Sequence, residues 1–165
     1  MKALPSRYSF LAIKNVRHPL PSDFDHLDYG GCSQFQKMIK RILFIDASVE
    51  DGRIFQQIIQ ESFTSITIDF ARSGPQAFAL LSKAGTDVIF LELILPGMDG
   101  IECLTKLKTI RNSKQIPVVL YTASKNEMEK KLALKLGAFD VISKTNNLST
   151  LADKLKKILS LPHYH

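Results

Sequence analysis

Four side chains that could do chemistry stand at the ends of apolar runs: Asp46, Glu92, Thr122 and Lys144. Runs such as ILFI, VIFL and VVLY are apolar on successive residues, which is typical of parallel strands covered on both faces. In open sheets of such strands, ligands bind beside the carboxyl ends, near the point where the strand order reverses. We therefore expect two carboxylates, a hydroxyl and an amine to converge at one edge of a sheet, and the function of the chain to lie there.

The segments that must position these side chains alternate regularly from Arg41 onward. The expected strands are residues 41–46, 65–71, 87–93, 117–123 and 140–144. Helix starts are indicated where a capping side chain stands three residues before an acid or amide, at Ser48, Ser73, Asp99 and Ser124. Gly85 and Gly137 stand where the second and fourth helices should end. The last helix is expected to bury Leu148, Leu151, Leu155, Ile158 and Leu159.

Five such strand–helix units in about 120 residues predict a fold class. Crossovers between parallel strands are right-handed, so the units should form an α/β fold with a doubly wound, five-stranded parallel sheet. The domain is expected to cover residues 38–161, with a short tail at 162–165. Residues 1–37 hold Pro5, Pro19, Pro21 and the pair Gly30–Gly31 and show no lasting period, which predicts an irregular or disordered N-terminal arm. In an alternative interpretation, Met38 is the natural start of the chain.

The composition excludes several classes of protein. Hydrophobic residues make up 45% and charged residues 23% of the chain, as in soluble globular proteins. No apolar run approaches the roughly 20 residues that cross a bilayer, and the N-terminus lacks the apolar core of a signal peptide. Cys32 and Cys103 form no CxxC pair, and the histidines show no metal-ligand spacing. We expect a cytoplasmic protein without a membrane partner.

The net charge of +6 leaves two interpretations open. Lysines along the expected fourth and fifth helices are either solvated, which is the favoured interpretation, or form a contact face for an acidic protein. No helix-turn-helix, zinc finger or basic–aromatic pattern supports nucleic acid as a partner. The lysines in question are Lys130, Lys131, Lys135, Lys154, Lys156 and Lys157.

Over residues 40–160 the sequence resembles the receiver domains of two-component signalling. The most specific stretch is DVIFLELILPGMDG at residues 87–100, in which the family usually has Asp at the sixth position. The segments ILFID, PVVLYTA, LGAFD and the final SK match as well. The resemblance implies a flavodoxin-like sheet with strand order 2-1-3-4-5.

The resemblance also implies roles for the four side chains. In the family, paired acids after the first strand hold Mg²⁺, an Asp accepts a phosphoryl group, a hydroxyl bonds the phosphate and a lysine neutralises it, because phosphoryl transfer depends on positioning and charge stabilisation. Asp46 then belongs to the acidic pocket and Glu92 stands at the phosphoacceptor position. Thr122 supplies the switch hydroxyl, and Lys144 is the phosphate-neutralising lysine.

The sequence departs from the family at both acids. Ala47 replaces the second metal-binding acid and offers no side-chain oxygen to Mg²⁺. Glu92 replaces Asp and carries its carboxylate about 1.5 Å further out. There it can pair with Lys144 and act as a weak permanent mimic of a phosphoaspartate. Val141 and Thr145 replace the aromatic and the proline usual near the lysine. We expect no cofactor; Mg²⁺ would bind, through Asp46, only if the site is still competent.

Three functions are compared. The favoured one is a non-enzymatic, single-domain receiver-like module of a phosphorelay that acts through protein–protein contact without Asp phosphorylation. The alternative is a working receiver phosphorylated by a histidine kinase. A small flavodoxin-like enzyme or nucleotide binder comes last, because no Gly-rich phosphate loop follows the first strand. No output domain follows the receiver in this sequence, so output is expected from a partner, either a histidine kinase or an acidic output protein.

Overall fold

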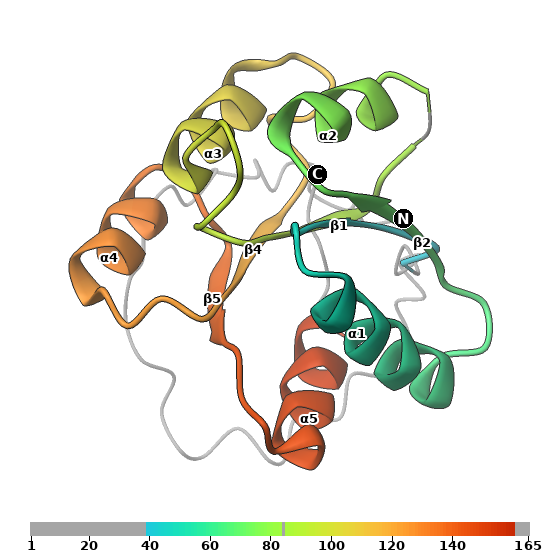
Figure 1. Ribbon diagram of the computed structural model, residues 1–165. Coiled ribbons are helices and arrows are strands. Elements are labelled where there is room, and N and C mark those ends of the chain that lie inside the picture. The colour runs from blue at the N-terminus through green and yellow to red at the C-terminus, as the bar shows by residue number, and fades with distance from the viewer. Residues whose placement is uncertain (1–38, 84, 161–165) are drawn as a thin grey trace, which may run out of the picture. The chain divides into compact units, whose positions relative to one another are not determined.

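The computed structural model describes residues 39–83 and 85–160, in which strands and helices alternate as the sequence predicts (Figure 1). The arm and the tail predicted from the sequence lie outside these residues. The elements are β1 (Arg41–Ile45), α1 (Val49–Ser62), β2 (Thr67–Ala71), α2 (Gly74–Leu81), β3 (Val88–Leu91), α3 (Gly100–Thr109), β4 (Val118–Thr122), α4 (Glu127–Lys135), β5 (Asp140–Ser143) and α5 (Leu148–Leu159).

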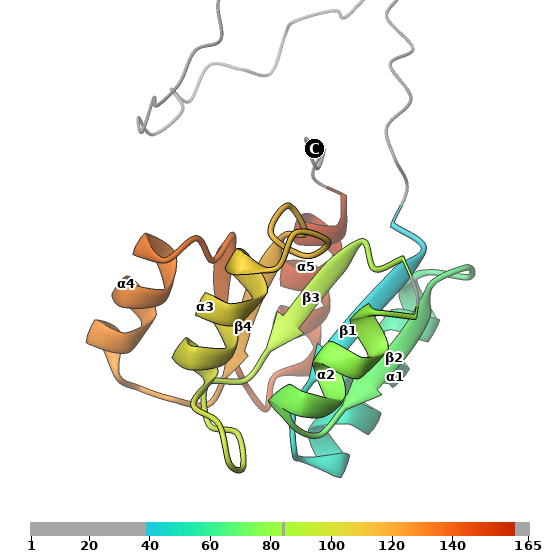
Figure 2. The same ribbon diagram turned by 90° about the horizontal axis from the view of Figure 1, so that it is seen from above.

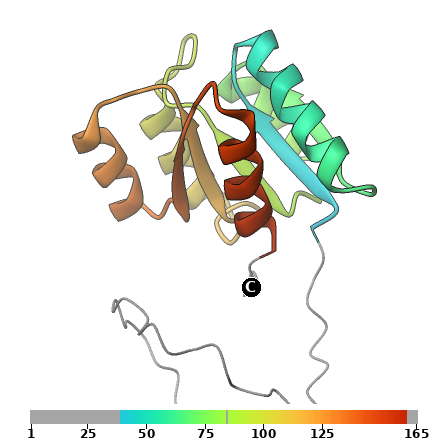
Figure 3. The same cartoon turned by 90° about the horizontal axis from the view of Figure 1, so that it is seen from below.

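The five strands form one parallel sheet in the order β2-β1-β3-β4-β5, which confirms the predicted fold and strand order. In register, Phe44 of β1 lies beside Phe70 of β2 and Phe90 of β3. Helices α2, α3 and α4 cover one face of the sheet (Figure 2), and α1 and α5 lie together on the other (Figure 3). The strand order reverses between β1 and β3, so the carboxyl ends of these two strands border the crevice where ligands bind in such sheets.

The apolar strands predict a core on each side of the sheet, and both cores are present. Towards α1 and α5, the rings of Phe44 and Phe55 lie 4.4 Å apart between centroids, and Phe90 and Tyr121 pack around them. The other core packs β-strand residues against α2, α3 and α4. Each fully buried large apolar side chain contributes about 1.5–3 kcal/mol, so the central strands form a rigid base for the residues that follow them.

The helix starts agree with the sequence at three positions. The side chains of Ser48, Ser73 and Asp99 accept hydrogen bonds from main-chain N–H groups in the first turns of α1, α2 and α3. The prediction for the fourth helix is wrong, because Asn126 caps α4 while Ser124 accepts from the N–H of Asn126. Ser124 and Asn126 can both accept main-chain hydrogen bonds. The helix begins directly after Asn126, whose side chain accepts from the N–H groups of Met128 and Glu129.

Two further expectations about helices are corrected. Helix α2 ends at Leu81 and is capped by Ser82, well before Gly85, because the main chain turns without needing a glycine there. Leu148 is 47% exposed, since it occupies the first position of α5, whose buried stripe begins at Leu151. Gly137 does follow the end of α4 with φ of 101°, a conformation that favours glycine. Among the described residues, no helix is long and apolar enough to cross a membrane.

Candidate functional site

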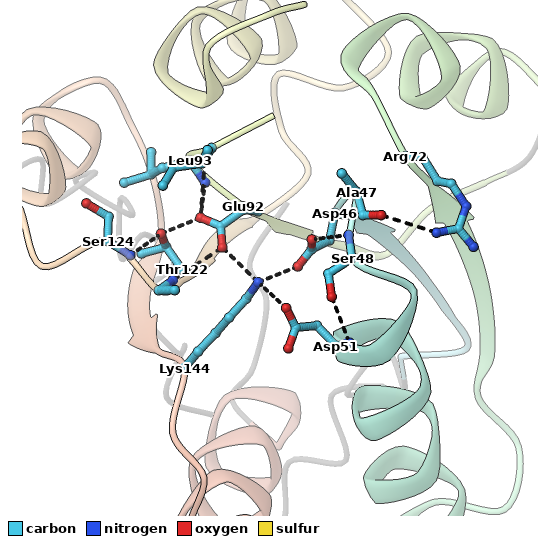
Figure 4. Close-up of polar contacts among 12 residues, drawn as sticks. Asp46, Ala47, Ser48, Asp51, Arg72, Glu92, Leu93, Thr122, Ser124 and Lys144 are labelled. Atoms are coloured by element: carbon cyan, nitrogen blue, oxygen red, sulfur yellow. Dashed lines mark hydrogen bonds and ion pairs between the residues drawn. The ribbon is translucent and has the colours of Figure 1, made fainter. Parts of the chain in front are cut away.

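The carboxyl edge of the sheet brings the predicted side chains together around Lys144 (Figure 4). Lys144 follows β5, and its Nζ lies 2.6 Å from Oδ2 of Asp46 and 2.7 Å from Oε2 of Glu92. A third carboxylate, Asp51 in the first turn of α1, lies with Oδ2 2.8 Å from the same nitrogen. Three acids from three elements therefore converge on one ammonium group.

Glu92 follows β3 directly, and both oxygens of its buried carboxylate are hydrogen-bonded. Oε1 accepts from the main-chain N–H of Leu93 at 2.6 Å, from Ile94 N–H at 3.3 Å and from the hydroxyl of Thr122. Oε2 accepts from the N–H of Ala123 at 3.2 Å and pairs with Lys144. The side chain is thus held by the ends of β3 and β4 and the residue after β5, which leaves it one orientation.

Asp46 follows β1 and is 6% exposed. Its Oδ1 accepts from the N–H of Ser48 at 2.8 Å, and its Oδ2 pairs with Lys144. The hydroxyl of Ser48 in turn accepts a hydrogen bond from the N–H of Asp51 and so caps the N-terminus of α1. One short segment therefore caps the helix and aims two carboxylates at the same lysine.

The electrostatics follow from three carboxylates sharing one positive charge. Burial acts to lower the pKa of Lys144, but its hydrogen bonds to Asp46, Asp51 and Glu92 raise it above the ordinary value. Burial acts to raise the pKa of Glu92, but the bonds from Lys144 and Thr122 bring it below the ordinary value. For Asp46, burial prevails over the bonds from Lys144 and Ser48, and its pKa is raised. Of these two carboxylates, Glu92 is therefore the one that the folded protein stabilises as an anion.

The donor set does not suit Mg²⁺, the ion that the family resemblance implies. Ala47 has no side-chain oxygen, and its main-chain oxygen accepts from the guanidinium of Arg72 at 3.3 Å. The oxygens of Asp46 and Glu92 are taken by Lys144 and by N–H or O–H donors. Mg²⁺ requires near-octahedral oxygen coordination. Across the described part of the chain, no group of three or more His, Cys, Asp or Glu side chains could hold a metal ion.

From the sequence, Asp51 is expected only as the acid that stands three residues after the capping Ser48, and its place in this site is not predicted. Its signal was present, because an acid five residues after Asp46 and within the first helical turn lies near the same sheet edge. Of the residues noted as departures, Val141 is partly buried against the core on the α2, α3 and α4 side.

The lysines proposed as a contact face do not all lie at the surface. Lys131 and Lys135 of α4 and the three lysines of α5 are exposed. Lys130 is only 9% exposed, and its Nζ bonds to Glu127 at 2.9 Å and to Ser143 at 3.3 Å. Lys130 therefore holds α4 to β5 and is not available to a partner.

The model of the response regulator receiver domain matches residues 42–156, so the chain belongs to the response regulator receiver domain family. A stretch of 127 residues is 31% identical to the transcriptional regulatory protein CpxR of Escherichia coli (strain K12), covering 76% of this chain and 52% of CpxR. A stretch of 86 residues is 35% identical to the sensory transduction protein RegX3 of Mycobacterium tuberculosis (strain ATCC 25618 / H37Rv), covering 52% of this chain and 37% of RegX3. The chain thus spans about half the length, or less, of these relatives.

Solved structures show the same family. The Mn²⁺-bound form of the response regulator Rcp1 superposes with a TM-score of 0.65 at 31% identity, covering 74% of this chain and 93% of Rcp1. The phosphorylated cyanobacterial phytochrome response regulator RcpA gives a TM-score of 0.65 at 31% identity, covering 73% and 91%. The receiver is a signalling module of two-component systems, as the sequence predicted.

Proposed function

We propose that this receiver signals through protein–protein contact without Asp phosphorylation, and that the Glu92 carboxylate takes the place of the phosphoryl group. The observation that carries the proposal is the set of donors around Glu92. The Thr122 hydroxyl, the Ala123 N–H and the Lys144 ammonium all point at it, and these are groups suited to a phosphoryl oxygen. A single carboxylate brings a charge of −1 where a phosphoaspartate brings nearly −2, so the mimicry is partial and permanent.

The same contacts argue against phosphoryl transfer to Glu92. A nucleophilic oxygen needs a free lone pair aligned with the incoming phosphorus, and a misplacement of about 1 Å can remove that alignment. Both oxygens of Glu92 are engaged, Oε1 by the Leu93 N–H and the Thr122 hydroxyl and Oε2 by the Ala123 N–H and Lys144. Without a second acid at Ala47, the charge of a metal is also missing from the transition state.

The working receiver stays as the second candidate because of two relatives. Rcp1 has been solved with Mn²⁺ bound and RcpA in a phosphorylated state, each 31% identical to this chain. Asp46, Thr122 and Lys144 match the family's pattern, so this alternative differs from the proposal at Ala47 and Glu92. The third candidate is a flavodoxin-like enzyme or nucleotide binder. It would need a glycine-rich phosphate loop after β1, and the described residues that follow β1 contain none.

The partner is proposed to be another signalling protein, a histidine kinase or an acidic output protein, which binds at α4 and α5. On α4, the outward side chains Met128 and Leu132 are 74% and 45% exposed and are flanked by Lys131 and Lys135. Exposed apolar side chains with lysines along one side fit an acidic amphipathic surface. On α5 the exposed lysines are Lys154, Lys156 and Lys157. CpxR is named a transcriptional regulatory protein, so its likeness gives no support for excluding nucleic acid.

Incubation with acetyl phosphate and Mg²⁺, followed by intact mass spectrometry, tests the missing phosphorylation. Wild type should gain no phosphoryl group, and neither Glu92→Asp nor Ala47→Asp alone should gain much. The double variant Ala47→Asp, Glu92→Asp should become phosphorylated, because residues that act as a unit around one ion are not additive. A stable adduct on wild type, mapped to Glu92 or Asp46, would overturn the proposal in favour of the working receiver.

The contact face is tested by charge reversal. The double variant Lys131→Glu, Lys135→Glu should associate more slowly with the cognate histidine kinase than wild type does, with the difference shrinking as salt rises. Lys83→Glu, an exposed lysine after α2, serves as the matched control and should bind as wild type. Unchanged association of the double variant at low salt would place the contact elsewhere.

A further inference from the structure

A small pocket opens between α1 and the end of β2, beside the charged cluster. Its lining includes Val49, Gly52, Arg53, Gln56, Phe70 and Arg72. We propose that it binds a single aromatic ring that carries a carboxylate: the ring packs on Phe70, and the carboxylate pairs with the guanidinium groups of Arg53 and Arg72. This site goes beyond the proposed function and does not depend on it, because neither Glu92 nor Lys144 lines the pocket.

The pocket has the size of one ring. Its volume is about 110 Å³, and an apolar cavity of about 150 Å³ in another protein holds benzene. Pockets for cofactors and drug-sized ligands measure roughly 300–1,000 Å³. The pocket is open to solvent on one side, so a substituent on the ring can extend out of it. A single ring with one charged group therefore fits, whereas a nucleotide is too large.

Gly52 leaves the aromatic wall of the pocket uncovered. It is buried within α1, where glycine is less favourable than alanine. A Cβ at this position would lie 3.4 and 3.5 Å from the Cε1 and Cδ1 atoms of Phe70, which is ordinary van der Waals contact. Packing therefore does not require glycine there. Because the methyl group is missing, one edge of the Phe70 ring stays open to the pocket, where a second ring can pack edge-to-face or offset against it.

The two arginines have donors available for an anion. The Arg72 guanidinium donates one hydrogen bond to a described residue, from Nη1 to the main-chain oxygen of Ala47 at 3.3 Å (Figure 4). Arg53 pairs with Glu50 at 4.0 Å, and this pair is weak because the two side chains are 75% and 74% exposed. A guanidinium group has five N–H donors in a planar fork that matches a carboxylate. Two such groups at one pocket therefore favour a carboxylate ligand.

The other polar groups of the pocket do not cancel this preference. Asp46 also lines the pocket, but its oxygens already accept from the Ser48 N–H and pair with Lys144. Gln56 forms no side-chain hydrogen bond with another described residue, so its amide can donate to a ligand as well. A ligand with a carboxylate is therefore attracted to the pocket, and an uncharged ring lacks this part of the interaction.

Titration of full-length ¹⁵N-labelled protein with sodium benzoate at neutral pH, followed by amide chemical shifts, tests the site. Benzoate should give saturable shifts centred on Gly52, Phe70 and Arg72, with a dissociation constant on the order of 1 mM, because so small a ligand makes few contacts. Benzyl alcohol keeps the ring without the charge, and acetate keeps the charge without the ring. Each should bind at least about fivefold more weakly than benzoate.

Two variants test the two parts of the site separately. Arg72→Met should weaken benzoate binding about fivefold and leave benzyl alcohol binding unchanged, since only the charge pairing is removed. Gly52→Ala should remain folded, because its Cβ meets no clash, and should weaken both ring compounds about threefold or more, because the methyl group covers the Phe70 ring. Arg111→Met, which removes an exposed arginine after α3, is the matched control and should bind benzoate as wild type does.

Four results would overturn the inference. Benzoate could give no saturable shifts, it could bind no better than benzyl alcohol, or Arg72→Met could leave its affinity unchanged. A loss in Arg111→Met as large as that in Arg72→Met would show general attraction to the basic surface and would overturn the inference too. A phosphoryl adduct on wild type after treatment with acetyl phosphate would overturn the proposed function alone, because that experiment concerns Glu92.

Discussion

Substitution of Glu92 by glutamine probes the central carboxylate with little change of shape. The amide has one oxygen and one NH₂ group, whereas both carboxylate oxygens accept hydrogen bonds. If the amide oxygen stays near Leu93 and Thr122, the NH₂ group faces the N–H of Ala123 and the Lys144 ammonium. If the amide is flipped, the NH₂ group faces the N–H of Leu93. In either orientation a donor meets a donor.

The size of the effect follows from these contacts. A hydrogen bond to a charged group contributes about 1.5–3 kcal/mol, and a buried donor left unsatisfied costs about 1–3 kcal/mol. Two effects oppose this loss: Lys144 keeps Asp46 and Asp51 as partners, and one buried charge no longer has to be desolvated. We expect Glu92→Gln to lower the free energy of unfolding by about 2–3 kcal/mol.

Urea unfolding at pH 7, followed by circular dichroism, measures this difference. With a slope of about 1.5 kcal/mol/M, the midpoint should fall by about 1.3–2 M. Glu102→Gln is the control, because Glu102 pairs with Lys106 on an exposed face of α3 and should cost less than about 1 kcal/mol. A Glu92→Gln midpoint equal to that of wild type would refute the reasoning, since it would show that the carboxylate charge is not used by its donors.

The pH dependence of the same difference has a determined sign. The pKa of Glu92 is lower in the folded protein than in the unfolded chain. Its contribution is therefore fully present above the unfolded pKa of about 4.3 and is lost as the pH falls through the folded pKa. The gap between wild type and Glu92→Gln should be constant from neutral pH down to about pH 5 and shrink below it. A gap that widens on acidification would contradict the assignment.

Three further predictions concern the surroundings of this carboxylate. Thr122→Val should destabilise the fold by about 1–2 kcal/mol in urea unfolding and Thr122→Ser by much less, because only the hydroxyl bonds Glu92; equal losses would contradict this. Gly100→Ala should cost about 3 kcal/mol or more, or prevent folding as judged by circular dichroism, because its Cβ would clash with Leu93 Cα and lie 2.6 Å from the main-chain oxygen of Glu92. The stability difference between wild type and Lys144→Met should be constant between about pH 5 and pH 10 and shrink above pH 10, since the folded pKa of Lys144 is raised and its contribution is lost as the pH rises through that value.

The charged cluster also has a structural role. It joins the ends of β1 and β3 to the start of α1 and to the residue that follows β5. Breaking a buried ion pair by removing one partner costs about 3–5 kcal/mol, although the whole cluster need not stabilise the fold more than an apolar one would. We infer that the cluster fixes one arrangement of these loops. The proposed function needs such an arrangement, because a receiver that is not phosphorylated would keep one signalling conformation.

The sequence by itself determined the fold and the members of the site that end strands. Apolar runs such as VIFL can be covered on both faces only inside a parallel sheet, and the carboxyl ends of such strands meet at one edge. Asp46, Glu92, Thr122 and Lys144 could therefore be assigned to one place before any coordinates were known. The departures at Ala47 and Glu92 could be recognised because a short motif fixes the position of each.

Only the tertiary structure decided how these groups pair. Which carboxylate contacts Lys144 depends on the direction of α1, and that direction comes from packing against β1 and α5; Asp51 therefore entered the site unforeseen. The same holds for Lys130, which reads as a surface lysine but lies at the junction of α4 and β5, where Glu127 and Ser143 satisfy it. Sequence periodicity gives the face of a helix, whereas the burial of a single long side chain depends on how closely two elements approach.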